Sequence, residues 1–191
     1  LIANAGVNPR PLSVVLPAGG AVSAPAGSPL PTQEIDGGVL VHDPATQVPG
    51  LGWITLASVS SDGSRGVASP VRASEEDGGF VLGNDLVRVG IGEDGAIAAL
   101  TDLRVNRAVL AERGNQLWTY VDKPRVYDAW DIDESYEQDG AELTDVVSMT
   151  LTEQGPLRAS VRVERAWRDS SIAQTYRLWA GSARLDIETE I

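Results

Sequence analysis

The chain has 191 residues, a formal net charge of −12 and a sequence pI of about 4.4. This acidity argues against nucleic acid or an anionic membrane as a partner, because clustered Lys and Arg bind phosphate groups, and it favours neutral ligands or protein neighbours. The sequence contains no cysteine, which excludes disulfides and thiolate metal sites. No apolar run approaches the roughly 18 residues of a membrane span. The first residues also lack the basic and apolar regions of a secretory signal, so we expect a cytoplasmic location.

The first unit, residues 1–73, is predicted to be a small β domain that ends in a linker. It holds few charged side chains and most of the prolines. The Gly- and Pro-rich tract 17–31 cannot sustain a helix. Apolar or alternating runs around this tract predict strands at residues 12–16, 39–42 and 53–59. The polar, glycine-ended stretch 69–79 is predicted as the linker.

A hairpin is predicted near the start of the second unit, residues 74–191. The strand candidates 86–91 and 96–103 flank Gly92-Glu-Asp-Gly95, a turn sequence suited to a hairpin. The same glycines belong to a G-x-G-x-x-G pattern, which is typical of dinucleotide-binding folds. Here, however, acidic side chains would lie where a pyrophosphate binds, and no βαβ alternation surrounds the pattern. The hairpin is therefore the prediction, with a helix at residues 96–110 as its competitor.

Three consecutive antiparallel strands are predicted near the end of the chain. Apolar and polar residues alternate with a period of two over residues 157–164, 172–180 and 183–191, as in strands with one buried face. Because the last run reaches the final residue without a turn or polar tail, we expect the sandwich to continue beyond it. The fold class predicted is all-β: a small β domain followed by an incomplete antiparallel β-sandwich.

Two patterns bear on metal binding. His42 is the only histidine, and common zinc sites need two or three histidines, or histidine with carboxylates, at close spacing. It is predicted to be a surface or turn residue. The oxygen-bearing side chains from Asp131 to Glu142 follow the ligand rhythm of a calcium-binding EF-hand loop, but Tyr136 stands where the loop needs glycine. A solvated acidic loop is the preferred interpretation, and no cofactor is expected in this chain.

The stretch Tyr120-Val-Asp-Lys-Pro-Arg-Val-Tyr-Asp-Ala-Trp-Asp-Ile-Asp133 interleaves aromatic and carboxylate side chains. Asp128, Asp131 and Asp133 raise the possibility of a glycosidase carboxylate pair. In an extended segment Asp131 and Asp133 share a face while Asp128 lies opposite, so the spacing selects no acid and base. Tyr127 and Trp130 suit stacking on a pyranose ring, or anchoring of the loop into a core or interface. With no catalytic residue predicted, the candidates for substrate-pocket or domain-interface contacts are Asp122, Tyr127, Asp128, Trp130 and Asp131.

Several stretches resemble the region that follows the catalytic part of family 38 glycoside hydrolases, the α-mannosidases. Val7-Asn-Pro-Arg-Pro-Leu12 and Val48-Pro-Gly-Leu-Gly-Trp53 resemble its middle β domain, and Leu82-Gly-Asn-Asp-Leu-Val-Arg-Val89 resembles the start of its large C-terminal sandwich. The most specific match is Gly114-Asn-Gln-Leu117 followed by the stretch ending at Asp133. It resembles the D-x-P-x-x-W-D-A-W-D-I segment of the bacterial and cytosolic branch.

This resemblance implies a galactose-mutarotase-like supersandwich, of which residues 74–191 form the N-terminal portion. It also implies a retaining parent enzyme that removes terminal α-linked mannose. The nucleophile, acid/base carboxyl and divalent metal, usually zinc, of such an enzyme belong to an N-terminal catalytic domain whose motifs do not occur here. This chain is then a non-catalytic piece, inactive alone, with the parent's catalytic domain and a mannose-containing glycan as partners. A stand-alone carbohydrate-binding β-sandwich is the alternative.

Overall fold

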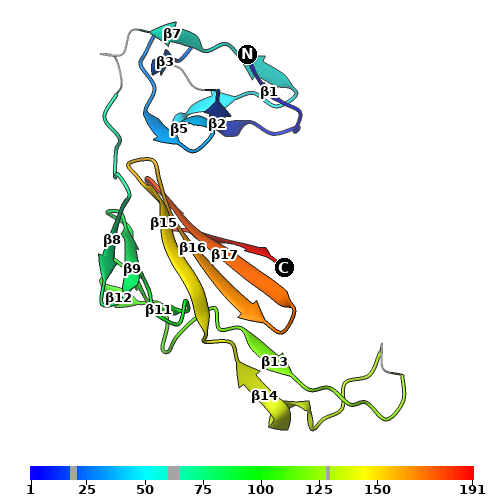
Figure 1. Ribbon diagram of the computed structural model, residues 1–191. Helices are drawn as coiled ribbons and strands as arrows, with labels where there is room; N and C mark the ends of the chain where they lie inside the picture. The colour runs from blue at the N-terminus through cyan, green and yellow to red at the C-terminus, as the bar shows by residue number, and fades with distance from the viewer. Residues whose placement is uncertain (18–20, 60–64, 128–129) are drawn as a thin grey trace.

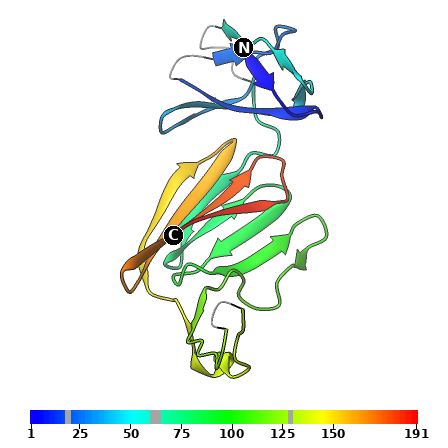
Figure 2. The ribbon, with the colours of Figure 1, turned by 90° about the vertical axis from the view of Figure 1, so that its right-hand side faces the viewer.

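The computed structural model describes residues 1–17, 21–59, 65–127 and 130–191, to which all structural statements refer. They form antiparallel strands joined by turns and by the 3₁₀ turn η2 (Tyr136–Asp139), which confirms the all-β prediction. The helix considered at residues 96–110 is absent from this part of the chain, which forms strands and turns. No described helix is long and apolar enough to cross a bilayer. Figures 1 and 2 show a small β unit at one end, a sandwich in the middle and a projecting hairpin at the other end.

The small β unit consists of short sheets around an apolar core. Its largest sheet has the order β2-β5-β4, built from β2 (Arg10–Leu16), β5 (Gly38–Val48) and β4 (Thr32–Ile35). Two-stranded sheets pair β1 (Ile2–Asn4) with β6 (Gly52–Ile54) and β3 (Ala21–Ser23) with β7 (Ala57–Val59). The residues buried in its core are Leu12, Val22, Leu30, Val41 and Val48.

Two strand predictions in the small unit differ from the structure, while the strand predicted at residues 12–16 is confirmed within β2. Residues 53–59 contribute to two strands, because β6 pairs with β1 whereas β7 pairs with β3. The strand predicted at residues 39–42 continues to Val48. The register opposite it shifts between Pro11 and Leu12, and this bulge accommodates Pro44, which has no N–H for a ladder bond.

The sandwich contains two antiparallel sheets whose apolar faces meet. The first has the order β12-β11-β10-β9-β8 and consists of β8 (Arg72–Glu76), β9 (Gly79–Gly83), β10 (Val87–Ile91), β11 (Ile97–Asp102) and β12 (Arg107–Ala108). The second has the order β15-β16-β17-β18 and consists of β15 (Val146–Gln154), β16 (Arg158–Trp167), β17 (Ser170–Trp179) and β18 (Leu185–Glu190). Both sheets contribute to one core, in which Leu82, Val89, Val161 and Tyr176 are completely buried.

Most of the strands predicted from alternating apolar and polar residues are present in this sandwich. The three strands predicted near the chain end are β16, β17 and β18, and the predicted hairpin is β10 and β11 around a turn closed by the Gly95 N–H on the Gly92 carbonyl. The linker predicted at residues 69–79 is wrong. Residues 72–76 form β8, which pairs with β9, and Val71 lies in the core. The domain boundary predicted after residue 73 falls inside that strand.

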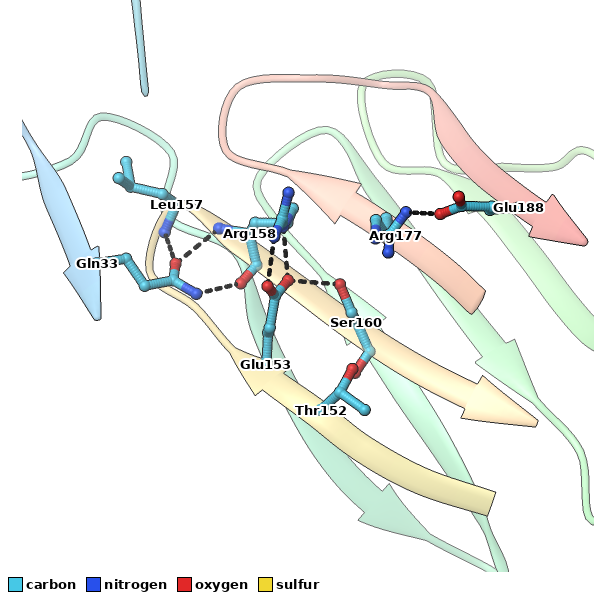
Figure 3. A network of polar contacts seen from close by, with 8 residues as sticks. All are labelled: Gln33, Thr152, Glu153, Leu157, Arg158, Ser160, Arg177 and Glu188. Carbon is cyan, nitrogen blue, oxygen red and sulfur yellow. Dashed lines mark hydrogen bonds and ion pairs between the residues drawn. The ribbon is translucent and has the colours of Figure 1, made fainter. Parts of the chain in front are cut away.

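The small unit and the sandwich meet at the side chain of Gln33, on β4. Its Oε1 accepts hydrogen bonds from the backbone N–H groups of Leu157 and Arg158, both at 2.8 Å, and its Nε2 donates to the Arg158 carbonyl at 2.8 Å (Figure 3). Gln33 is only 6% exposed. One buried amide therefore satisfies three backbone groups at the start of β16, and it joins residues that lie far apart in the sequence.

Candidate functional site

The candidate site is the hairpin that projects from the sandwich at the end opposite the small unit (Figures 1 and 2). Its base is β13 (Trp118–Tyr120) paired with β14 (Gly140–Glu142). The rings of Trp118 and Tyr120 stack with centroids 6.2 Å apart, and Tyr136 meets Tyr120 edge-on at 5.1 Å. Gly140 lies opposite Tyr120, and a Cβ there would stand 2.6 Å from the Tyr120 ring. Glycine therefore leaves room for the ring to lie across the neighbouring strand.

Backbone and carboxylate hydrogen bonds shape the tip of the hairpin. The N–H groups of Trp130 and Asp131 both donate to the Tyr127 carbonyl, at 2.7 and 2.9 Å. Asp122 accepts from the Asp133 N–H at 3.3 Å, which ties the outgoing chain to the returning chain. Asp133 in turn accepts from the side chain and backbone of Ser135, and these hydrogen bonds lower the pKa of its carboxyl. We call residues 118–142 the aromatic loop.

Several large apolar side chains are exposed on the aromatic loop. Trp130 is 90% exposed and Tyr127 is 74% exposed. The other large apolar side chains exposed on the loop are Trp118, Tyr120, Val121, Val126 and Ile132. A gathering of exposed apolar side chains rimmed by charged groups is typical of a surface that binds another protein or domain.

Four of the five predicted site residues can be located in the structure. Asp122, Tyr127, Trp130 and Asp131 all lie on the aromatic loop, whereas Asp128 lies outside the described residues. An anchor inside a core is excluded for Tyr127 and Trp130 by their exposure, which leaves the interface or sugar-stacking interpretation. Asp131 itself is not in a strand, and its N–H donates to the Tyr127 carbonyl.

The sequence analysis missed three aromatic residues of this site. Trp118, Tyr120 and Tyr136 form the contacts that support the loop, but Tyr136 is separated from the other two by a long stretch of chain. The alternation of Trp118, Thr119 and Tyr120 is the only local signal for a strand with one aromatic face. It is too short to predict which side chains it meets.

The metal-binding patterns do not assemble into ligand sets. Glu142, at the last position of the EF-hand pattern, lies in β14 and pairs with Arg113 at 2.8 Å. Asp43, next to His42, is buried and bound to Thr46 and Arg65 at 2.8 and 3.0 Å. Within the described ranges, no three His, Asp or Glu side chains gather as metal ligands would.

His42 is not the surface or turn residue that was predicted. It lies inside β5, half-buried between the two units, and its ring centroid is 4.7 Å from that of Trp179 on β17. Burial lowers its pKa, and the nearby Arg158 guanidinium lowers it further, although Asp43 opposes both effects. The sequence could not indicate this position, because Trp179 lies in the other unit.

The family model for the C-terminal domain of glycosyl hydrolases family 38 matches residues 82–191, more than half of the chain. This chain belongs to glycosyl hydrolase family 38. The match includes the aromatic loop and both sheets of the sandwich, apart from β8 and the start of β9. Among curated proteins, alpha-mannosidase G of Dictyostelium discoideum is 28% identical to this chain over 134 residues. That alignment covers 63% of this chain but only 12% of the relative, so the chain spans a small part of the relative's length.

Proposed function

We propose that this chain is a non-catalytic β-sandwich portion of a retaining α-mannosidase that removes terminal α-linked mannose from glycans. In this proposal the aromatic loop docks on the N-terminal catalytic domain of the same parent chain. The observation that carries the docking is the exposure of Trp130, at 90%, within a surface that also exposes Tyr127 and Ile132. Buried aromatic anchors supply much of the binding free energy in protein interfaces.

The chemistry of mannoside hydrolysis is assigned to the catalytic domain. The divalent metal that the family implies does not fit the residues of this chain: its single histidine contacts Trp179, and the adjacent Asp43 is bound to Arg65. The aspartates of the aromatic loop that have described partners bind the loop's own N–H and hydroxyl groups. We therefore expect the isolated chain not to hydrolyse an aryl α-mannoside.

The charge of the loop predicts the chemistry of the catalytic-domain surface on which the loop docks. Acidic side chains outnumber Lys123 and Arg125 around the apolar residues. Electrostatic complementarity then requires an apolar patch rimmed by Arg or Lys on the catalytic domain. A mannose-containing glycan at the edge of this interface would contact the loop only if Trp130 or Tyr127 extended into the sugar pocket.

The test is Trp130→Ala in the parent enzyme. We expect a loss of about 2 kcal/mol or more in the free energy that couples the two domains, because a large aromatic contact is removed. Differential scanning calorimetry should show a lower melting temperature for the parent, while KM for a mannoside stays near the wild-type value. In the isolated chain the same change should alter stability by less than about 0.5 kcal/mol, since the side chain is exposed there.

The matched control is Trp53→Ala, which removes another exposed tryptophan, 65% accessible, from β6 of the small unit. It should leave the stability of the parent nearly unchanged. If Trp130→Ala raises KM strongly and leaves the melting temperature intact, the loop belongs to the sugar pocket and the interface assignment is wrong.

A stand-alone carbohydrate-binding module is the second candidate. The stacked rings of Trp118 and Tyr120, both nearly half exposed, offer aromatic faces of the kind that suit pyranose rings. Calorimetric titration of the chain with methyl α-mannoside separates the candidates. Saturable heat that Trp118→Ala abolishes would favour the binding module, whereas an interface piece should give none.

A further inference from the structure

The junction between the small unit and the sandwich holds an aromatic contact beside the Gln33 amide. The His42 ring packs on Trp179 at a tilt of 44°, and the Arg158 guanidinium lies 4.9 Å from the centroid of the same indole. Figure 3 places the backbone of Arg158 against Gln33 and its guanidinium against Glu153. Arg158 therefore takes part in both contacts between the units.

One nitrogen of the His42 ring has, in the described part of the chain, no acceptor for the proton that it carries in the imidazolium. Its Nδ1 atom is buried and lacks a hydrogen-bond partner among the described residues. In the neutral ring, protonated on Nε2, this leaves only a lone pair unsatisfied. In the imidazolium, Nδ1 carries an N–H that would be buried without an acceptor, which is more costly than burying the lone pair of the neutral ring.

The charges around His42 also disfavour an imidazolium. On its own strand, Asp43 is the nearby carboxylate, but it is already paired with Arg65. From β16, Arg158 faces the same indole and is itself bound to Glu153. A groove of about 620 Å³ beside the ring is lined by Arg10 of the small unit and by Arg184 and Asp186 of the sandwich, which pair with each other. The groove lets protons reach the ring without adding an unpaired carboxylate.

We propose that this junction is an acid-sensitive latch, in which the small unit docks on the sandwich only while His42 is neutral and opens when His42 is protonated. Gln33 supplies a contact with no titrating group, so the latch is held at neutral pH by the amide and the aromatic pair together. The lowered pKa of His42 agrees with this geometry.

The direction of the pH effect follows from linkage. A histidine that is harder to protonate in the docked state than in the open state favours docking at high pH. The full docking free energy is present above the ordinary pKa of 6.5. It declines as the pH falls below that value, until it levels off below the lowered pKa of the docked state.

The experiment follows the imidazole resonances of the 191-residue chain by NMR as the pH is lowered. His42 is the only histidine, so its titration is read without assignment ambiguity. We expect a pKa below 6.5 in the wild type. In Gln33→Leu, which leaves the Leu157 and Arg158 N–H groups unpaired, the junction opens and the pKa of His42 should rise toward 6.5. Gln47→Leu, an exposed change on the same strand as His42, should leave it at the wild-type value.

Two results would overturn the latch: a wild-type pKa at or above 6.5, or the same lowered pKa in Gln33→Leu as in the wild type. A second measurement does not depend on the folding of Gln33→Leu. Because the chain lacks cysteine, spin labels can be placed by Asp36→Cys in the small unit and Asp169→Cys in the sandwich, both at exposed turns. The distance distribution should broaden between about pH 7.5 and about pH 5, either side of an ordinary histidine pKa, and stay narrow in His42→Gln. A distribution that does not change with pH in the wild type also rejects the latch.

Discussion

Gly95 occupies a position with no room for a side chain. It lies in the β10–β11 turn at φ +72°, a left-handed conformation, and its carbonyl accepts the Tyr176 hydroxyl at 2.6 Å. A Cβ at this position would collide with the Arg165 guanidinium and stand 2.6 Å from Val163. Arg165 is 2% exposed and donates to the Asp94 carbonyl, so it has little space to move away. The turn and the second sheet therefore both require glycine here.

Gly95→Ala should lower the free energy of unfolding by about 2 to 5 kcal/mol, from the left-handed backbone and from overpacking against Arg165 and Val163. Urea unfolding followed by tryptophan fluorescence measures this loss. Gly27→Ala is the control, because Gly27 has φ +81° but no atom within 4 Å of its would-be Cβ. It should cost only about 1 to 2 kcal/mol. Equal losses in the two variants would show that crowding at Gly95 is unimportant.

At the scale of elements, Asn84 ties the start of β10 to the turn after β17. Its Oδ1 accepts from the N–H groups of Leu86 and Val87, at 2.8 and 3.0 Å. Its Nδ2 donates to the carbonyls of Trp179 and Ser182, at 2.9 and 2.8 Å. Asn84 is 8% exposed, so these four hydrogen bonds are protected from water and join the two sheets at the edge of the core.

Asn84→Ala should cost about 2 to 4 kcal/mol of unfolding free energy, because buried N–H and C=O groups lose their partners. Asn84→Asp separates the two halves of the contact. It keeps the acceptors, but at neutral pH it points a carboxylate at two carbonyls, which raises the pKa of the new carboxyl in the folded state. Its stability relative to the wild type should therefore improve as the pH falls, since the protonated acid can donate. A deficit that is independent of pH between about 7 and 4 would contradict this account.

The strands that could be predicted from sequence are those in which apolar and polar residues alternate, so that one face is apolar. Residues 157–164 and 172–180 alternate cleanly and form adjacent strands. The neighbouring β15 was missed because Ser, Thr and Glu follow one another around Met149 and Leu151, and only part of its apolar face is buried. The polar strand β8 was mistaken for a linker because its place in the sheet depends on backbone pairing with β9. Such pairing leaves no trace in hydropathy.

At the scale of the whole molecule, the junction and the aromatic loop lie at opposite ends of the sandwich (Figures 1 and 2). The aromatic loop could be recognised as a candidate site from sequence, because its aromatic and acidic residues are contiguous. Its exposure could not, because exposure depends on the hairpin projecting beyond both sheets. The junction was unpredictable for a related reason: Gln33 and His42 gain their roles from partners more than a hundred residues away.

The aromatic loop also carries Lys123, the only lysine of the chain, and its side chain is exposed. Within these residues an amine-reactive reagent therefore has a single side-chain target, located on the proposed docking surface. Acetylation read by mass spectrometry should be fast at Lys123 in the isolated chain and several-fold slower in the intact parent. Equal rates in the two would mean that the catalytic domain leaves this part of the loop uncovered. Because lysine is so rare, labelling of Lys123 reports directly on whether the loop is covered, and no substitution is needed.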